Sequence, residues 1–311
     1  MRVLVTGARG KVGVAAVVEL HRAGHEVTAT DLIAPGEGAV PPGAARYLQA
    51  DLTDAGSADA LVRGMDAVVH AGAIPVPLHH PPHVLFANNV MAGFNVVEAC
   101  VRWQVPRLVN LSSETVTGFV FAERRILPTK LPIDEQTPCA PQDPYGFGKQ
   151  VIEQWCDAAV ARSELSVISI RPSWVQRDAE DYERNVGPMV RDPDQPSLGF
   201  WSYTDNEDLA VAIRLAVEVT STGHEVVYVA QPDNATNRHL DDLVATAFPD
   251  EGIEVSDPGQ PGDTPPNTAG TGRSGIDSSK ARRLLGWSPT RSWRDVLDDD
   301  GHRREVRTPG R

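Results

Sequence analysis

A glycine-rich segment near the N-terminus constrains the fold of this chain more than any other feature. Gly7, Gly10 and Gly13 form a GxxGxxG spacing directly after the apolar run Arg2–Thr6. Such glycines are needed where the backbone turns sharply, where it approaches a pyrophosphate and where a helix packs closely on a strand. Apolar residues then recur at helical spacing over Val12–Ala23. The sequence therefore predicts a strand, a phosphate-binding turn and a helix in succession.

An acidic residue lies where a dinucleotide site requires one. Asp31 follows a second strand-like segment, His25–Thr30, near the ~20-residue offset of a ribose-binding acid. A carboxylate there accepts hydrogen bonds from the adenosine ribose and repels a 2′-phosphate. We therefore expect NAD rather than NADP, and Arg9 in the turn is the feature that points the other way.

The first half of the chain alternates strand-like and helix-like segments, and a further pair returns later. This repeated βαβ pattern predicts an α/β fold with a Rossmann-type, doubly wound parallel sheet. We expect strands at Tyr47–Ala50, Ala67–His70, Arg107–Leu111, Ser166–Ile170 and Glu225–Val229, and helices at Val84–Trp103, Tyr145–Ala161 and Glu207–Val219.

The pattern changes in the C-terminal third, which indicates a second structural unit. We expect residues 1–172 and 205–230 to form an NAD-binding domain, and residues 173–204 and 231–297 to form a small substrate-binding lobe. Residues 256–275 are rich in Pro, Gly, Asp and Thr, which predicts a long surface loop or a mobile lid. Residues 298–311 are expected to be a frayed tail.

Charge and composition narrow the class of partner. A net charge of −13 disfavours nucleic acid and anionic membranes. No apolar run approaches the ~18 residues of a membrane span, and the N-terminus lacks signal-peptide features, so we expect a cytoplasmic protein without membrane partners. Cys100, Cys139 and Cys156 lack metal-ligand spacing, and the His79–His83 cluster is interrupted by prolines; we predict no metal site.

A tyrosine and a lysine are spaced for chemistry at the start of a predicted helix. Tyr145 and Lys149 are four residues apart, which places them on one helix face. An ammonium group and a nicotinamide cation would both favour the phenolate of a tyrosine whose ordinary pKa is ~10. Ser112-Ser113-Glu114-Thr115 follows a predicted strand at the carboxyl edge of the sheet, where ligands of such sheets bind. These residues predict a proton-transfer site.

Taken in order, these motifs resemble the extended short-chain dehydrogenase/reductases of the NAD-dependent epimerase/dehydratase family. The resemblance implies that Ser113 hydrogen-bonds the reacting oxygen, that Tyr145 is the acid/base, and that Lys149 holds the nicotinamide ribose and lowers the pKa of Tyr145. It also implies a homodimer through the two long helices. The matching stretches cover nearly the whole chain: TGARGKVG, Asp31, DAVVHAGA, NNVMAGFNVVEAC, NLSSETVTG, DPYGFGK, Arg171-Pro172 and DSSKARRLLGWSP.

Residues at the predicted strand ends complete the expected cofactor site. Asp51 and Leu52 are placed to flank the adenine, small residues at 71–73 let backbone pass close to the dinucleotide, and the resemblance adds Asn88 and three wall residues. The cofactor-binding prediction comprises Gly7, Arg9, Gly10, Lys11, Val12, Gly13, Asp31, Leu32, Asp51, Leu52, Ala71, Gly72, Ala73, Asn88, Leu111, Tyr145, Lys149, Pro172 and Ser173.

Departures from the family pattern bear on the substrate. Glu114-Thr115 stands where dehydratases of the family carry an Asp-Glu pair, so dehydration is disfavoured. Trp201 stands where the epimerases tend to carry an Arg for the diphosphate, and the stretch from Arg171 to Asp208 is short, which argues against a large nucleotide lobe. For Trp174 and Trp201, packing is the competing role. The predicted substrate residues are Ser113, Thr115, Trp174, Asn185 and Trp201.

Three functions fit these motifs. The leading one is an NAD-dependent epimerase acting on a secondary alcohol of a sugar or nucleotide sugar through transient hydride transfer. The second is an NAD-dependent dehydrogenase of a small sugar, uronate or polyol, which uses the same residues. The third, a non-catalytic NAD-sensing regulator, is disfavoured because the Tyr145 and Lys149 pair is present.

Overall fold

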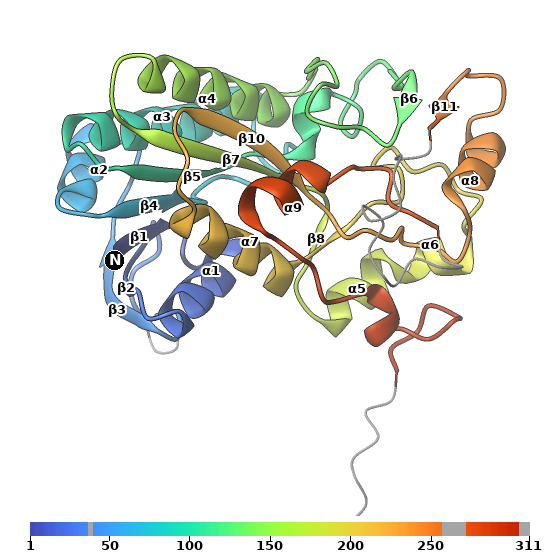
Figure 1. The fold of residues 1–311 in the computed structure, drawn as a ribbon, viewed down its shortest axis with the longest axis horizontal. Helices are drawn as coiled ribbons and strands as arrows, with labels where there is room; N and C mark the ends of the chain where they lie inside the picture. The colour runs from blue at the N-terminus through green and yellow to red at the C-terminus, as the bar shows by residue number, and fades with distance from the viewer. Residues whose placement is uncertain (37–39, 257–271, 305–311) are drawn as a thin grey trace, which may run out of the picture.

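The computed structural model describes residues 1–36, 40–256 and 272–304 (Figure 1). Its centre is a seven-stranded, entirely parallel sheet with the strand order β10-β7-β5-β4-β1-β2-β3. The order reverses between β1 and β4, so the ends of these strands flank the point where ligands bind in open α/β sheets. The strands are β1 (Arg2–Thr6), β2 (Glu26–Asp31), β3 (Ala44–Gln49), β4 (Ala67–His70), β5 (Arg107–Leu111), β7 (Ser166–Pro172) and β10 (His224–Val229).

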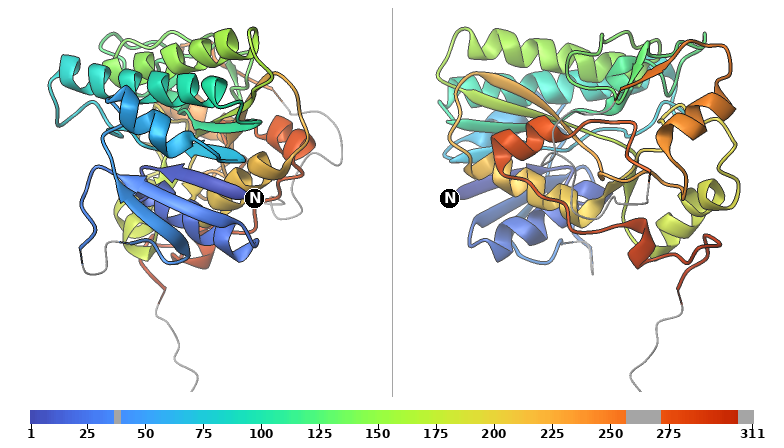
Figure 2. Two further views of the ribbon diagram at one scale, coloured as in Figure 1. Left: turned by 90° about the vertical axis from the view of Figure 1, so that its left-hand side faces the viewer. Right: turned by 45° about the vertical axis from the view of Figure 1, so that its right-hand side comes forward.

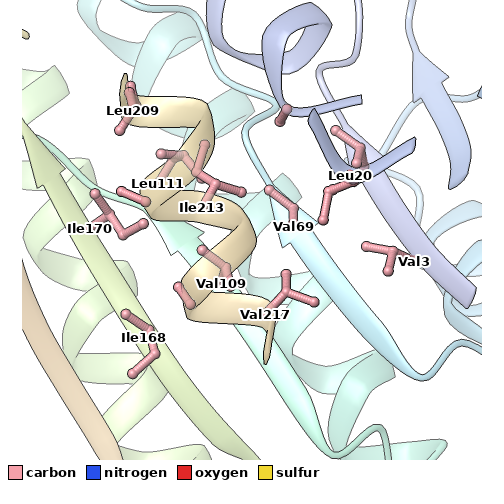
Figure 3. Packing of buried hydrophobic residues seen from close by; sticks show 14 of the residues in the cluster. Val3, Leu20, Val69, Val109, Leu111, Ile168, Ile170, Leu209, Ile213 and Val217 are labelled. Carbon is pink, nitrogen blue, oxygen red and sulfur yellow. The ribbon is translucent and has the colours of Figure 1, made fainter. Parts of the chain in front are cut away.

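Helices cover both faces of this sheet, which confirms the doubly wound prediction (Figure 2). One face carries α1 (Lys11–Arg22), α7 (Asn206–Glu218) and α9 (Ser279–Leu285), and the other carries α2 (Ala55–Val62), α3 (Pro82–Arg102) and α4 (Pro144–Val160). Figure 3 shows Leu209, Ile213 and Val217 of α7 lying over Val109 and Ile168 of the sheet.

Alternate residues of the central strands pack in two separate cores, which explains the unbroken apolar run Val3–Val5 in β1. Val3 and Val5 pack in the cluster with α1 and α7, whereas Leu4 packs in the cluster with α2, α3 and α4. Leu4 lies in register with Val68 of β4, which faces the same side. Successive side chains of a strand point to opposite faces, so a strand covered on both sides carries a run of apolar residues.

The rest of the chain packs beyond the carboxyl ends of the strands. Two further apolar clusters form there, around Trp201 and Phe248 and around Tyr203 and Trp293. The division into a cofactor domain and a lobe stays a prediction. The remaining elements are the 3-10 helices η1 (Glu114–Thr117) and η2 (Trp293–Asp295), the strands β6 (Lys130–Leu131), β8 (Val175–Gln176), β9 (Thr204–Asp205) and β11 (Glu254–Val255), and the helices α5 (Ala179–Asn185), α6 (Gly187–Arg191) and α8 (Leu240–Ala247).

The prediction of a frayed tail is wrong for residues 298–304. Asp298 Oδ1 accepts the amides of Asp300 (3.0 Å) and His302 (2.9 Å), which closes a turn. The Gly301 carbonyl accepts Arg191 Nη1 at 2.9 Å, so the turn is fixed to α6. Residues 305–311 lie outside the described residues, as do residues 257–271 of the segment predicted to be a loop or lid.

Helix α3 is the one helix among the described residues that is long and apolar enough to cross a membrane, with a mean hydropathy of 1.4 over an 18-residue window. Half of that window is buried inside the fold. Packing between the sheet, α2 and α4 accounts for its apolar composition.

Candidate active site

The glycine turn between β1 and α1 leaves no room for side chains. Gly7 has a φ of 62°, and a Cβ there would lie 2.6 Å from Gly72 Cα. A Cβ on Gly13 would lie 2.1 Å from the carbonyl oxygen of Gly7. The turn therefore packs directly on the segment after β4 and ends at the N-terminus of α1, and this cradle fits a dinucleotide pyrophosphate.

Asp31 is joined to the glycine turn. Its Oδ2 accepts the backbone amide of Arg9 at 3.0 Å, and its Oδ1 accepts the amide of Ile33 at 3.4 Å. The carboxylate is thus held at the carboxyl end of β2, with Leu32 exposed beside it. Each carboxylate oxygen has a further lone pair, so ribose hydroxyls remain suitable donors.

Two predicted cofactor residues have other contacts. The Lys11 ammonium donates to the Val175 carbonyl at 2.9 Å and pairs with Asp181 at 2.7 Å, so it reaches from the turn to α5. Leu52 packs inside the core beneath α2 and α3, and a role against the adenine is not supported by this burial. Such contacts join segments far apart in the chain, which local patterns do not reveal.

Asn89, rather than the predicted Asn88, holds the segment that follows β4. Asn89 is buried and clamps the segment after β4, since it accepts the Ile74 amide at 2.8 Å and donates to the Ile74 carbonyl at 2.9 Å. Asn88 is partly exposed and donates to Asn89 at 3.0 Å. The two successive asparagines were the available sequence signal for this clamp.

The start of α4 positions Tyr145, the predicted acid/base. Asp143 caps this helix by accepting the amides of Tyr145 and Gly146, both at 2.9 Å. A Cβ on Gly146 would lie 2.6 Å from the Thr115 carbonyl oxygen, so α4 begins in direct contact with η1. This contact brings Tyr145 close to the Ser113 hydroxyl, which stabilises the phenolate and itself accepts the Thr115 amide at 3.2 Å.

Lys149 lies one helical turn after the tyrosine. Its ammonium is buried, donates to the Leu111 carbonyl at 2.5 Å and lies 5.7 Å from the centre of the Tyr145 ring. The structure therefore brings together Ser113, Tyr145 and Lys149 at the carboxyl ends of β5 and β4, beside the glycine turn.

Burial governs the ionisation of these groups. Burial raises the pKa of Tyr145 to about 12, and the charges of Asp143 and Glu114 act in the same direction. The Ser113 hydrogen bond opposes this shift because it stabilises the phenolate. In the protein alone the pKa of Tyr145 is therefore raised rather than lowered, because desolvation of the phenol dominates, and the lowering effect of Lys149 stays a prediction. Burial also lowers the pKa of Lys149 to about 8.

A neutral histidine lies near this lysine. Thr6 Oγ1 accepts the Gly72 amide at 3.1 Å and shares a hydrogen bond with Nδ1 of His70, 2.9 Å away. Burial, together with the Lys149 charge, lowers the pKa of His70 to about 3. Sequence reasoning assigned neither Thr6 nor His70 to the site, although both end strands at its edge.

The predicted substrate residues differ in their exposure and in their contacts. Trp174 is 48% exposed, whereas Trp201 is fully buried and packs on Phe248 with ring centres 6.0 Å apart. Trp201 as a substrate contact is therefore wrong, and the competing packing role holds. Asn185 donates to Gln176 at 2.9 Å, and the Thr115 hydroxyl is buried without a hydrogen-bond partner among the described residues.

Ser173 and Arg171 have structural partners. Ser173 Oγ donates to Glu114 Oε1 at 3.0 Å, which ties the end of β7 to η1. Arg171 forms a buried ion pair with Glu153 at 2.6 Å, so the Arg171-Pro172 motif fixes α4 to the sheet. Over the described ranges, no group of three or more His, Cys, Asp or Glu side chains is arranged to hold a metal ion.

Residues 3–176 match the model of the NAD dependent epimerase/dehydratase family. The chain is 28% identical to the UDP-glucose 4-epimerase of Lactobacillus helveticus, over 93% of this chain and 92% of that protein. It is 27% identical to the uronate dehydrogenase of Pseudomonas putida, over 76% of this chain and 80% of that protein. A short-chain dehydrogenase/reductase superfamily protein from Agrobacterium tumefaciens, solved with bound NAD, superposes with a TM-score of 0.68 at 21% identity, covering 94% of each chain.

Proposed function

Because the chain belongs to the NAD-dependent epimerase/dehydratase family, we propose that this NAD-dependent enzyme epimerises a secondary alcohol of a sugar or nucleotide sugar. The observation that carries the proposal is the contact between Ser113 and Tyr145 beside Lys149 and the glycine turn. The curated relatives support it, because they include UDP-glucose 4-epimerases that match over nearly the whole chain.

The reacting oxygen would lie between two hydroxyl groups. The Ser113 hydroxyl lies close enough to the Tyr145 hydroxyl to stabilise its phenolate, so both groups address the same small volume. Tyr145 would take the proton of a substrate hydroxyl and return it, while Ser113 holds that oxygen in place. The chemistry that NAD supplies when bound is hydride acceptance and hydride return. Gly7, Gly10, Gly13 and Asp31 would hold its pyrophosphate and ribose.

The burial of Tyr145 sets a requirement for this reaction. With its pKa near 12, the phenol holds its proton at neutral pH. Positive charge has to develop nearby for it to act as a base, and the Lys149 ammonium, 5.7 Å from the ring centre, contributes such a charge. Since burial brings the pKa of Lys149 to about 8, that contribution is lost as the pH rises through this value.

A dehydrogenase of a small sugar or uronate is the second candidate. Uronate dehydrogenases are among the similar proteins, and the stretch from Arg171 to Asp208, where a nucleotide lobe would be built, is short and contains the two short helices α5 and α6. The two functions differ in whether the oxidised sugar is kept and reduced on its other face, or released.

We expect a new stereoisomer without net NADH formation when the purified protein is incubated with NAD and sugar nucleotides. The measurement follows NADH absorbance and product NMR together, with UDP-glucose and glucuronate as the first two probes. NADH in proportion to product would instead establish the dehydrogenase. Failure of both across a broad panel of sugars, with NAD bound, would favour a non-catalytic role.

We further propose a homodimer that forms through α3 and α4. Met91 of α3 is 42% exposed, Phe147 of α4 is 48% exposed, and Phe147 stacks on Phe86 at 5.8 Å. Light scattering is expected to give twice the 33.6 kDa mass of one chain. A charge at the exposed Met91 (Met91→Glu) should return the protein to monomer, whereas Leu78→Glu, in a separate exposed loop, should not. A wild-type mass of one chain would refute this interface.

A further inference from the structure

Glu114 is a buried carboxyl group directly after Ser113. It lies in η1 and is 7% exposed. Ser173 Oγ donates to its Oε1 at 3.0 Å, and the Trp174 backbone amide also donates to the carboxyl group. The side chain therefore joins the ends of β5 and β7 under the site.

No cation offsets this carboxyl group. Over residues 1–36, 40–256 and 272–304, no ion pair reaches it, whereas the equally buried Glu153 is paired with Arg171. On its open side lies Gly199, where a Cβ would be 3.9 Å from Oε1 and 4.0 Å from Oε2. The Ser197 hydroxyl lies equally close to this position, at 3.9 Å.

The charge of Glu114 affects the ionisation of two tyrosine hydroxyl groups. Its charge raises the pKa of Tyr145 in α4 and of Tyr228 in β10. The other titratable groups facing this region are Asp143 and Lys149, which flank Tyr145, and Arg171, whose Nη1 lies 3.4 Å from the Tyr228 hydroxyl.

We propose that Glu114 is a positioning residue of the reaction at Tyr145: its uncharged form leaves the tyrosine able to give up a proton, and its carboxylate form prevents this. The inference rests on the proposed function, in which Tyr145 carries the proton transfer. It follows from the location of an unpaired buried acid directly after the residue that holds the reacting oxygen.

The sign of the expected pH dependence follows from burial. Desolvation raises the pKa of Glu114 to about 8, so the group is mostly protonated at neutral pH. Above that pH its negative charge opposes the phenolate of Tyr145. Turnover is therefore expected to fall above about pH 8. A tyrosine without this neighbouring charge would instead become a better base as the pH rises.

The test compares Glu114→Gln with wild type in the full chain. We expect wild-type kcat, measured with NAD and UDP-glucose from about pH 6 to about pH 10, to fall by more than about tenfold per unit above about pH 8, because the favourable forms of Glu114 and Lys149 are both lost there. Lys149 titrates in the same range, so Glu114→Gln should remove the part of the fall that Glu114 causes and leave a shallower one. Identical profiles for the two proteins would overturn the proposal.

Glu135→Gln is the matched control. Glu135 is a partly buried carboxyl group whose pKa is also raised by burial, and its Oε1 accepts the Tyr228 amide at 2.8 Å. Because it has no role at Tyr145, its replacement should keep the wild-type profile. If Glu114→Gln fails to fold, Ser173→Ala replaces it, since loss of the hydroxyl donor raises the pKa of Glu114 and should move the fall to higher pH.

A second readout does not depend on turnover. The infrared carbonyl stretch of a protonated carboxyl group should disappear as the cofactor-free wild type is titrated through about pH 8, and it should be missing from Glu114→Gln. Absence of this band from wild type would overturn the inference even if the enzyme is an epimerase. Its presence in a protein that turns over no sugar would refute the proposed function and leave the state of Glu114 established.

Discussion

Replacing Tyr145 with Phe is expected to lower turnover by about 10²–10⁴-fold, the range that a positioned acid/base contributes. The hydroxyl is the group that the structure places against Ser113, and the ring stays packed at the start of α4 when it is removed. NAD affinity and thermal stability should therefore stay close to those of wild type. Product NMR gives kcat, and calorimetric titration with NAD gives the dissociation constant.

Tyr47→Phe is the matched control for this variant. Its hydroxyl donates to the Ile33 carbonyl at 2.6 Å, beyond the end of β2 and away from Ser113, so turnover should be retained. If Tyr145→Phe keeps turnover within about threefold of wild type, proton transfer does not pass through this residue.

Replacing Gly13 with Ala is expected to weaken NAD binding at least about tenfold, which corresponds to about 1.4 kcal/mol. The new methyl group would lie 2.1 Å from the carbonyl oxygen of Gly7, so the turn or the first turn of α1 has to move. Overpacking of this kind typically costs about 1–3 kcal/mol of folding stability, so the melting temperature should fall as well. Titration with NAD and thermal unfolding measure the two effects.

Gly56→Ala provides the comparison. Gly56 also lies in the first turn of a helix, but a Cβ there would come no closer than 3.4 Å to Asp54 and would meet no backbone. This variant should match or exceed the stability of wild type, because alanine favours the helix over glycine. Wild-type NAD affinity in Gly13→Ala would mean that the close packing of the turn is not what shapes the cofactor site.

The parallel sheet and the positions of Tyr145 and Lys149 on one helix face could be predicted because each depends on short stretches of chain. Strands buried on both faces carry runs of apolar residues, and β4 and β5 have the predicted bounds, Ala67–His70 and Arg107–Leu111. The helix with Tyr145 begins one residue earlier than predicted because Asp143 caps it. The family match extends this agreement to the cofactor, since NAD is part of the family's description.

What could not be predicted depends on contacts between distant segments. Nothing near Trp201 in the sequence shows that its ring packs on Phe248, nor does the sequence place Ser173 against Glu114. The raised pKa of Tyr145 could not be predicted for the same reason, because it depends on contacts between distant segments. The spacing to Lys149 was correct, but the desolvation that raises the pKa arises only when the whole site is assembled.

The ion pair between Lys11 and Asp181 has a thermodynamic consequence. Lys11 is the first residue of α1, and Asp181 lies in α5, in the segment expected to face the substrate, so the pair links α5 directly to the turn that would hold the cofactor. Linkage is reciprocal: by whatever factor a bound cofactor changes substrate affinity through this pair, substrate changes cofactor affinity by the same factor. In an epimerase, such coupling would favour retention of both molecules until the hydride has been returned.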